Sequence, residues 1–194
     1  MILEGIVTSL DERGSLNVAP MGPIVEPSMQ TLSLRPYKTS TTYRNLKANP
    51  CGVFHVIDDV LLLARAAIGR LERVPPTFPA EKVEGRVLVD ACRWYEFEVE
   101  SLDDSRDRTE IAARVVHCGR IRDFLGFNRA KHAVLEAAIL ATRVHLLPPE
   151  EIARQFDALA IPVEKTAGPE EREAFALLKR YVSEYDKAGT PIEG

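Results

Sequence analysis

Apolar residues occur first in short runs and later at helical spacing along the chain. Short apolar runs bounded by Gly, Pro, Asn or Asp predict strands at residues 2–10, 15–19, 29–34, 51–57, 86–91, 93–100 and 110–122. Short loops join most of these runs, and few helices lie between them. The pattern therefore predicts an antiparallel barrel rather than a doubly wound parallel sheet.

Two local patterns add detail to this predicted sheet. Pro20-Met21-Gly22-Pro23 follows the second run, and proline cannot donate to a strand ladder, so the chain leaves the sheet there. Such a point is either a bulge or a place where the backbone meets a flat ligand. In residues 94–99 apolar and acidic positions alternate, which predicts a half-exposed strand with Glu96 and Glu98 on the polar face.

Helical periodicity appears in four segments. Residues 60–71 follow Asp58-Asp59 and end near Gly69, and residues 128–147 repeat alanine at helical spacing. Pro149 and Pro169, each followed by two glutamates, predict helix starts, and these helices are expected to end near Leu159 and Tyr185. We expect one barrel domain at 1–147 and a helical extension at 148–194, packed on the barrel or on a partner subunit.

The segment Leu34 to Asn49 carries the clearest candidate chemistry. Arg35, Tyr37 and Lys38 precede four consecutive hydroxyl residues, and a short helix is predicted at 41–48. The unpaired N–H groups and dipole of a helix start favour an anion, and the two cations add charge, so the pattern suits a phosphate monoester. The alternative is an ordinary Ser/Thr N-cap with solvated basic residues.

A narrow polar stripe runs along the helix predicted at 128–147. Arg129, His132, Glu136 and Arg143 project within roughly 60° of one another on a helical wheel. One interpretation is a surface pair of His132 with Glu136, four residues apart. The other is that the stripe lines a cleft, from which Arg129, Lys131 or His132 reaches a ligand.

Composition narrows the class of protein. The chain is 45% hydrophobic and 28% charged with a net charge of −4, which is typical of a soluble globular protein and argues against a nucleic-acid surface. Three widely spaced cysteines predict neither a disulfide framework nor a metal site. No membrane segment or signal peptide is recognisable, so a cytoplasmic protein without membrane contact is expected. No nucleophile-and-base motif is present, so any chemistry is expected to come from a bound cofactor.

Four motifs in order, NVAPMG, LRPYKTSTTYRNL, FHVIDDVLLLARAA and GFNRAKHAVLEAAILATR, resemble the family called domain of unknown function 447. The resemblance covers about residues 2–147. It implies an FMN-binding, antiparallel split β-barrel related to flavin reductases and pyridoxamine-phosphate oxidases, with a C-terminal helical extension. It also implies a homodimer with FMN in a groove at the subunit interface.

The resemblance implies a set of site residues. The FMN phosphate would lie on residues 39–42 with Arg35 and Lys38 as counter-charges, residues 17–22 would follow the isoalloxazine edge, and the stripe near residue 130 would close the site, possibly from the other subunit. The expected FMN contacts are Asn17, Ala19, Pro20, Met21, Gly22, Arg35, Tyr37, Lys38, Thr39, Ser40, Thr41, Thr42, Tyr43, Asn45, Asn128, Arg129 and Lys131. His132 is the candidate catalytic residue.

The function implied is that of an FMN-dependent oxidoreductase acting on a small molecule in tetrahydromethanopterin-linked one-carbon metabolism. Three alternatives stay open at this point. In the first, the protein is a non-catalytic flavin carrier, chaperone or sensor. In the second, it binds another phosphorylated cofactor, such as coenzyme F420 or pyridoxal phosphate. In the third, it is a structural dimer whose hydroxyl motif is only a helix cap.

Overall fold

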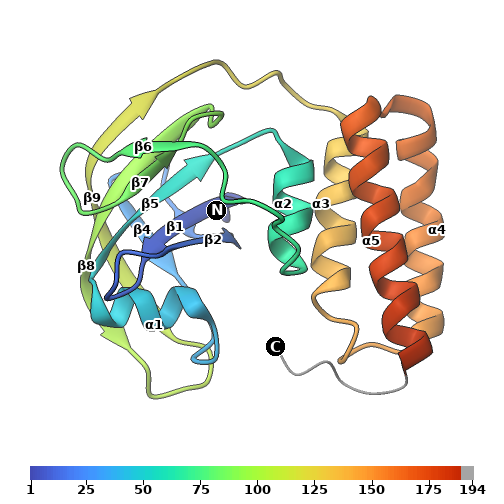
Figure 1. Ribbon diagram of the computed structural model, residues 1–194, viewed down its shortest axis with the longest axis horizontal. Coiled ribbons are helices and arrows are strands. Elements are labelled where there is room, and N and C mark those ends of the chain that lie inside the picture. Colours follow the sequence, from blue (N-terminus) through green and yellow to red (C-terminus); the bar gives the residue numbers. More distant parts are fainter. Residues whose placement is uncertain (189–194) are drawn as a thin grey trace. The chain divides into compact units, whose positions relative to one another are not determined.

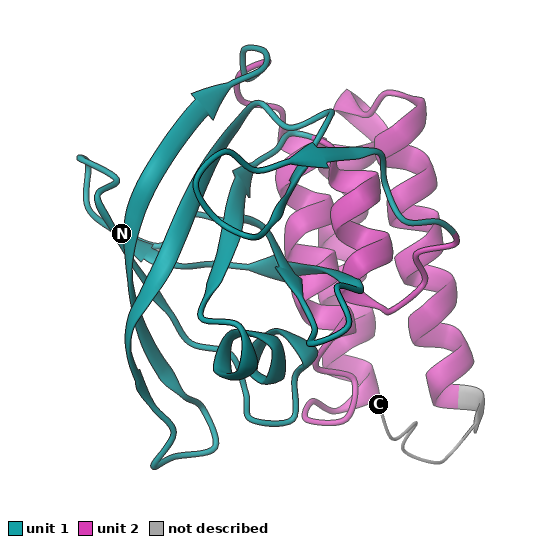
Figure 2. Cartoon of the chain, turned by 60° about the vertical axis from the view of Figure 1, so that its left-hand side comes forward, with its two compact units in different colours: residues 1–58, 73–124 teal, residues 59–72, 125–194 magenta. Residues whose placement is uncertain are grey.

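The chain folds into two compact units, coloured separately in Figure 2. A computed structural model describes residues 1–188. Residues 1–58 and 73–124 form the first unit, which we call the barrel unit, and residues 59–72 and 125–194 form the second, the helical unit. The division falls at residue 124 rather than at the expected residue 147, because the helix that follows the linker packs with other helices. The end of the expected extension, residues 189–194, lies outside the described residues.

The barrel unit is built on one seven-stranded antiparallel sheet with the order β2-β1-β5-β8-β9-β4-β3, and a two-stranded sheet, β6-β7, lies beside it. The strands are β1 (Gly5–Leu10), β2 (Leu16–Met21), β3 (Ile24–Val25), β4 (Thr31–Leu34), β5 (Cys51–Val56), β6 (Thr77–Pro79), β7 (Arg86–Leu88), β8 (Arg93–Asp103) and β9 (Glu110–Arg120). The helix of this unit, α1 (Thr41–Ala48), contacts β1 and β2. Figure 1 shows the strands of this unit curled into a partial barrel, and apolar side chains fill its interior.

The N-terminal residues bring the two edges of the curled sheet together. An isolated antiparallel bridge joins Ile2 to Ile24, and the Leu3 N–H donates to the Pro23 carbonyl at 3.1 Å. The segment that leads into β1 therefore pairs with β3, which lies at the far end of the strand order. The sheet is an incomplete, split barrel, as expected from the sequence, and its core includes the fully buried Phe54 and Phe97.

Glu96 corrects one prediction made for β8. It was expected on the solvent face with Glu98, but its side chain is fully buried. Its carboxylate accepts hydrogen bonds from the backbone N–H groups of Glu81, Lys82 and Val83 at 2.6–3.3 Å and from the Trp94 indole at 3.1 Å. The polar face of the strand is covered by the β6–β7 loop, and the buried charge is satisfied by these donors.

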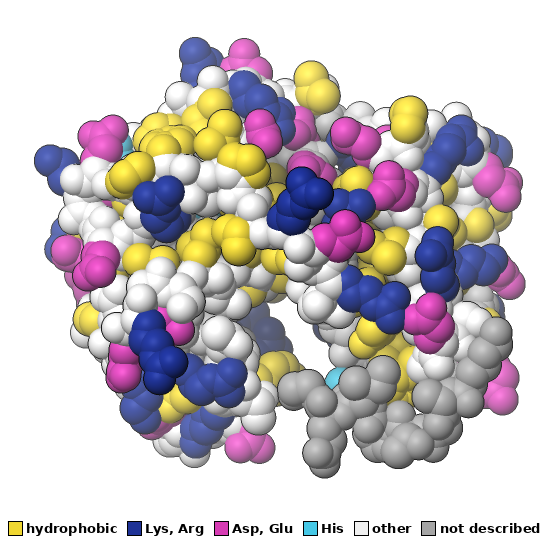
Figure 3. Space-filling view, in the orientation of Figure 1, with side chains coloured by type: hydrophobic (Ala, Val, Ile, Leu, Met, Phe, Trp, Pro, Cys, Tyr) yellow, Lys and Arg dark blue, Asp and Glu magenta, His cyan; other side chains and the backbone are white. Residues whose placement is uncertain are grey.

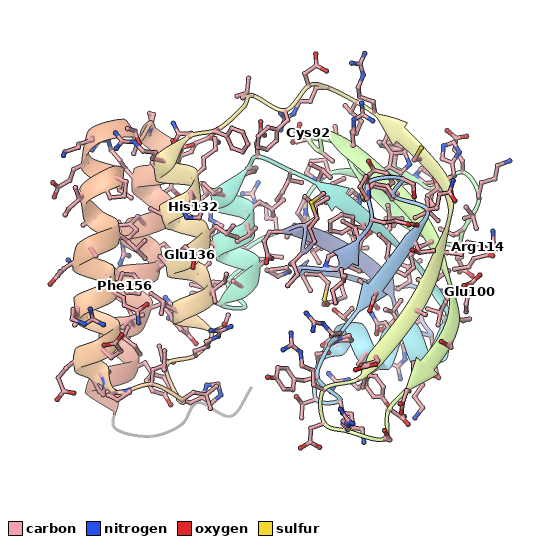
Figure 4. All side chains as sticks on the ribbon, turned by 180° about the vertical axis from the view of Figure 1, so that it is seen from behind. Cys92, Glu100, Arg114, His132, Glu136 and Phe156 are labelled. Atoms are coloured by element: carbon pink, nitrogen blue, oxygen red, sulfur yellow. The ribbon has the colours of Figure 1, made fainter. Side chains whose placement is uncertain are left out.

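The helical unit contains α2 (Val60–Ala67), α3 (Arg129–Ala141), α4 (Pro149–Thr166) and α5 (Pro169–Ala188). The alanines of α3 at 130, 133, 137 and 141 are fully buried, and this small-residue face lets α2, α4 and α5 pack closely around α3. The ring centroids of Phe156 on α4 and Phe175 on α5 lie 5.6 Å apart, and Phe156 is labelled in Figure 4. Gly69 ends the α2 segment with a φ of +66°, a conformation that glycine adopts without strain.

Several elements differ from the predictions, either in presence or in extent. β3 and β6 were not predicted, because strands of two and three residues carry no readable periodicity. α3 ends at Ala141 rather than at residue 147. α4 continues through Pro162 to Thr166 instead of ending near Leu159. Its last turn is held by buried Val163 and by a hydrogen bond from Asn128 Nδ2 to the Thr166 carbonyl at 3.2 Å.

Candidate functional site

The loop between β4 and α1 is the centre of the candidate site. Ser40 is the N-cap of α1: its hydroxyl accepts from the Tyr43 N–H at 3.2 Å and donates to the Tyr37 carbonyl at 2.7 Å. The Arg44 guanidinium donates to the Thr39 carbonyl and to the Thr41 hydroxyl. The helix at 41–48 and its Ser cap are thus confirmed, and the capping bonds fix the shape of the loop.

Three polar groups at this loop have no hydrogen-bond partner among residues 1–188. The backbone N–H groups of Thr41 and Thr42 precede the first intrahelical bond, and neither donates to a described residue. The Nε atom of Arg35 is buried and also unpaired. The Arg35 Nε is the one side-chain donor of the described residues that is both buried and unpaired, which is costly, and the N–H groups of exposed Thr41 and buried Thr42 lie at the start of α1 without an acceptor.

The cations beside the loop add positive charge to it. Arg35, Lys38 and Arg44 form no ion pair with any residue of the described chain, whereas neighbouring Lys47 pairs with Asp104 at 2.8 Å. Figure 3 shows Lys and Arg side chains gathered over α1 and the β8–β9 turn. The positive end of the helix dipole has the same sign as these cations, so the site attracts an anion.

A hydrogen bond connects the loop to the second predicted motif. Asn17, on the edge strand β2, donates from Nδ2 to the hydroxyl of buried Thr42 at 3.1 Å. Asn17 Nδ2 also lies 3.4 Å from the hydroxyl of Ser9, which accepts from buried Asn45 at 3.1 Å. β2 continues through Ala19, Pro20 and Met21 and ends before Gly22, and all four residues are partly exposed. The fold thus brings the residue 17–22 segment and the hydroxyl loop to one end of α1.

The β8–β9 turn, residues 104–109, supports the loop from the other side. Buried Tyr43 donates from its hydroxyl to Asp104 at 2.7 Å, and Lys47 contacts both groups. The hydrogen bonds from Lys47 and Tyr43 lower the pKa of the Asp104 carboxyl to about 2. Tyr43 and Asn45 were expected as cofactor contacts. Their polar atoms instead form hydrogen bonds to Asp104 and Ser9, which hold α1 against the rest of the barrel unit.

The predicted polar stripe lies in the helical unit, and Asn128 and Lys131, which were expected to act with it, have structural partners there. Asn128 caps α3 by accepting from the N–H groups of Ala130 and Lys131. Lys131 forms a largely buried ion pair with Glu171 of α5 at 2.9 Å. His132 and Glu136 both lie on α3 (Figure 4), and His132 and Arg129 are exposed. No ion pair joins His132 to Glu136 within the described structure.

Residues missed by the sequence analysis lie close to the loop in space. Arg44 was not among the predicted site residues, although its neighbours Tyr43 and Asn45 were. It lies three residues after Thr41 on the helix, and this spacing could have predicted its hydrogen bond to the Thr41 hydroxyl. Asp104 and Arg108 lie about seventy residues further along the chain. No local pattern relates them to the loop, because only the pairing of β4 with β9 brings them there.

Residues 1–188 contain no group of side chains placed to bind a metal ion and no helix that could span a membrane. No cluster of three or more His, Cys, Asp or Glu side chains is placed to hold a metal ion in that part of the chain. None of its helices combines the length and the apolar character needed to cross a bilayer. The three cysteines are free thiols, with Cys92 buried and Cys118 exposed.

Comparison with solved structures shows that the chain has the split-barrel fold, which it shares with several flavin-binding proteins. An FMN-bound DUF447-family protein from Methanosarcina mazei superimposes with a TM-score of 0.79 at 24% identity, covering 93% of this chain and 94% of that one. The flavin reductase of styrene monooxygenase from Pseudomonas putida S12 gives 0.51 at 18% identity, covering 61% and 80%. Flavoredoxin from Methanosarcina acetivorans gives 0.52 at 12% identity, covering 61% and 68%. At these identities the likeness shows the fold.

Sequence models identify the family. The model described as "Protein of unknown function (DUF447) N-terminal domain" matches residues 3–122, and the model described as "Protein of unknown function (DUF447)" matches residues 128–180. The chain belongs to the DUF447 family, as its four motifs predicted. A search of curated proteins finds no match. The two models meet near residue 125, where the barrel unit gives way to α3 and the helices that follow it.

Proposed function

We propose that the protein binds FMN in the barrel unit and acts as a flavoprotein. The observation that carries this proposal is the set of unpaired donors at the β4–α1 loop: the N–H groups of Thr41 and Thr42 and the buried Nε of Arg35. A phosphate monoester has the three acceptor oxygens and the negative charge that such donors require. The FMN bound to the family member from Methanosarcina mazei supports the same ligand here.

The described residues fit this cofactor. Residues 39–42 would hold the phosphate, with the unpaired N–H groups of Thr41 and Thr42 as backbone donors, and Arg35 and Lys38 would neutralise it. Residues 17–22 would follow the ring edge, because Asn17 is tied to Thr42 at the same end of α1. Bound FMN supplies hydride and electron transfer that no side chain provides. Asn128 and Lys131 are left out of this set, since both are committed to contacts within the helical unit.

A redox reaction is the function that such a cofactor supports best. The solved structures of the same fold include flavin reductases, so we propose an oxidoreductase that takes electrons from a nicotinamide and passes them to a small acceptor. A homodimer in the cytoplasm and an acceptor of the tetrahydromethanopterin type belong to this proposal. A non-catalytic flavin carrier is the second candidate, because no side-chain hydrogen bond or ion pair among residues 1–188 orients His132, the candidate catalytic residue, as an acid or base.

Binding is tested by a visible spectrum of the purified protein followed by titration with FMN and with riboflavin. We expect flavin absorption bands or saturable FMN binding, and weaker binding of riboflavin, because riboflavin lacks the phosphate. A colourless protein that does not bind FMN would overturn the proposal and leave only the fold. Pyridoxal phosphate and coenzyme F420, titrated in parallel, identify a different phosphorylated ligand.

Catalysis is tested separately on the FMN-loaded protein. Anaerobic NADH or NADPH should bleach the bound flavin, and an added acceptor should restore its colour over many cycles. Bound flavin that no nicotinamide reduces would favour the carrier. If turnover occurs, the variant His132→Ala compared with Arg129→Ala shows whether the candidate catalytic residue takes part. Size-exclusion chromatography with light scattering at several protein concentrations tests the homodimer.

A further inference from the structure

The β8–β9 turn is attached to the proposed phosphate loop by its backbone. Tyr37 and Arg108 form an isolated antiparallel bridge. The Lys38 N–H donates to the Asp107 carbonyl at 2.9 Å, and Thr109 donates from both its N–H and its hydroxyl to the Pro36 carbonyl at 2.9 and 2.8 Å. Because these bonds flank Arg108 on both sides, its position relative to the loop is fixed by the main chain.

The side chain of Arg108 is oriented by two further contacts. Its Nε donates to the Arg35 carbonyl at 3.3 Å, and its guanidinium carbon lies 5.8 Å from the centroid of the Tyr37 ring. A guanidinium is a planar fork with five N–H donors, of which this hydrogen bond uses one. The two terminal nitrogens make no hydrogen bond or ion pair with any residue between 1 and 188.

We infer that Arg108 is a further phosphate ligand of the proposed flavin site, supplied by the β8–β9 turn and supported by the ring of Tyr37. This inference rests on the proposed function. A phosphate monoester carries about 1.5–2 negative charges near neutral pH and three strong acceptor oxygens, so the guanidinium of Arg108 adds directed, charge-assisted hydrogen bonds to the charge that Arg35 and Lys38 supply. Two of its N–H groups form a planar fork that matches two phosphate oxygens, whereas a lysine acts as a point charge without that fixed geometry.

The inference assigns Tyr37 a different role from the one expected. Its side chain is 56% exposed, and one face of the ring is in contact with the Arg108 guanidinium. Cation–π contact of this kind restricts a long side chain that would otherwise sample many rotamers. Tyr37 is therefore a positioning residue for Arg108 rather than a direct contact of the cofactor.

Arg106 provides a matched control on the same turn. It lies two residues before Arg108 and is also exposed, but no hydrogen bond, ion pair or ring contact joins it to residues 35–42 within the described chain. Removing Arg106 changes the net charge of the turn by the same amount as removing Arg108. Any difference between the two variants then reports the specific placement of Arg108 and not the overall charge.

The experiment measures dissociation constants for FMN and riboflavin with the full chain and with Arg108→Ala, Arg106→Ala and Tyr37→Leu. Arg108→Ala should weaken FMN binding about tenfold or more, as expected for a lost charge-assisted bond, with riboflavin binding unchanged. Arg106→Ala should change either constant by no more than about twofold, the effect of an exposed charge. The FMN dissociation constant of Tyr37→Leu should lie between those of Arg108→Ala and Arg106→Ala, and its riboflavin constant should be unchanged.

Several results would overturn the inference. Unchanged FMN affinity in Arg108→Ala would exclude a phosphate contact, and equal losses for FMN and riboflavin would indicate a general disturbance of the site. A loss in Arg106→Ala as large as that in Arg108→Ala would indicate bulk electrostatics. If Arg108→Ala melts at a lower temperature than the parent without ligand, Arg108→Lys replaces it and should lose affinity for FMN only. FMN binding by the parent chain itself decides the proposed function independently of these variants.

Discussion

The ring of His55 accepts a hydrogen bond at Nε2 from the backbone N–H of Leu88, at 3.1 Å, in the interior of the barrel unit. Its other nitrogen, Nδ1, lies 3.2 Å from the carbonyl of Ile6 and so carries the proton. The ring is fully buried and joins β1, β5 and β7 as a neutral group. Both nitrogens are satisfied without a charge, and the side chain is unsuited to acid–base chemistry.

The stability of the barrel unit should fall with acidity because of this histidine. Burial lowers the pKa of His55 from 6.5 to about 4, so between these values the unfolded chain binds a proton that the folded chain does not. The free energy of unfolding therefore decreases as the pH falls from 6.5 toward 4, by about 3 kcal/mol from this group. Urea denaturation at several pH values measures how steeply the free energy of unfolding depends on pH. The His55→Gln variant should be less stable at pH 7, but its free energy of unfolding should depend less on pH. An unchanged pH dependence would contradict the role given to His55.

Glu96 should be a major determinant of stability for the β6–β7 loop. Burial by itself raises the pKa of a carboxyl, but the N–H groups of Glu81, Lys82 and Trp94 outweigh burial and leave the pKa of Glu96 below its usual value. Glu96→Gln turns an amide group toward these donors and should cost at least about 2 kcal/mol of unfolding free energy. Faster proteolytic cleavage within residues 80–85 should accompany the loss.

Glu98 is the matched control on the same strand. Its carboxylate is half-exposed and pairs with Arg114 at 3.0 Å on the outer face of the sheet, where Glu100 also contacts Arg114 (Figure 4). Glu98→Gln should cost less than about 1 kcal/mol, as is usual for surface ion pairs. Equal effects of the two substitutions in urea denaturation would contradict the role given to Glu96.

Lys131 should contribute to the stability of the helical unit and not to cofactor binding. Its ammonium pairs with Glu171, whose carboxylate also accepts from the Gly168 N–H at 2.8 Å at the start of α5. Burial is the largest single effect on Glu171 and raises its pKa, but the Lys131 contact and the Gly168 N–H together outweigh burial and leave the pKa below its usual value. Lys131→Met leaves a buried carboxylate without its cation and should cost about 3 kcal/mol. Calorimetric melting measures this loss, and weakened FMN affinity without a change in melting would return Lys131 to the site.

Arg35 and Lys38 should determine affinity for the phosphate end of the ligand. Replacing both with Ala removes two charge-assisted contacts, and FMN binding should weaken by a few kcal/mol, with about 1.5–3 kcal/mol from each. The measurement is an FMN titration compared with riboflavin, for which the double variant should match the parent. The control is Arg65→Ala with Arg70→Ala, which removes the same charge from helical-unit residues paired with Glu173 and Glu184. An unchanged FMN constant would exclude the phosphate assignment.

Local signals in the sequence predicted the parts of the site that are local in structure. Ser40 and its neighbouring hydroxyls predicted the start of α1 correctly, because an N-cap depends on residues within one turn. Arg108 escaped prediction because its contact with Arg35 spans 73 residues. Glu96 was predicted on the solvent face because the alternation of apolar and acidic residues shows which face of a strand a side chain is on. It does not show that a loop covers that face, as the β6–β7 loop does here. Pro162 indicated a helix end, but the last turn of α4 is held by the local hydrogen bond from the Thr166 hydroxyl to the Pro162 carbonyl and by the tertiary hydrogen bond from Asn128 to the Thr166 carbonyl.

The helical unit is assembled from segments that are far apart in the sequence. α2 lies within the stretch that interrupts the barrel unit, and its partners α3 and α5 follow more than sixty residues later. At ribosomal rates of about 5–20 residues per second, α2 emerges on the order of ten seconds before α5 is complete. During that interval its buried residues Leu63 and Ala64 have no helix to cover them. Synthesis thus leaves an apolar helix that a chaperone can recognise, and cutting the gene at residue 124 would deprive the C-terminal fragment of one of its four helices.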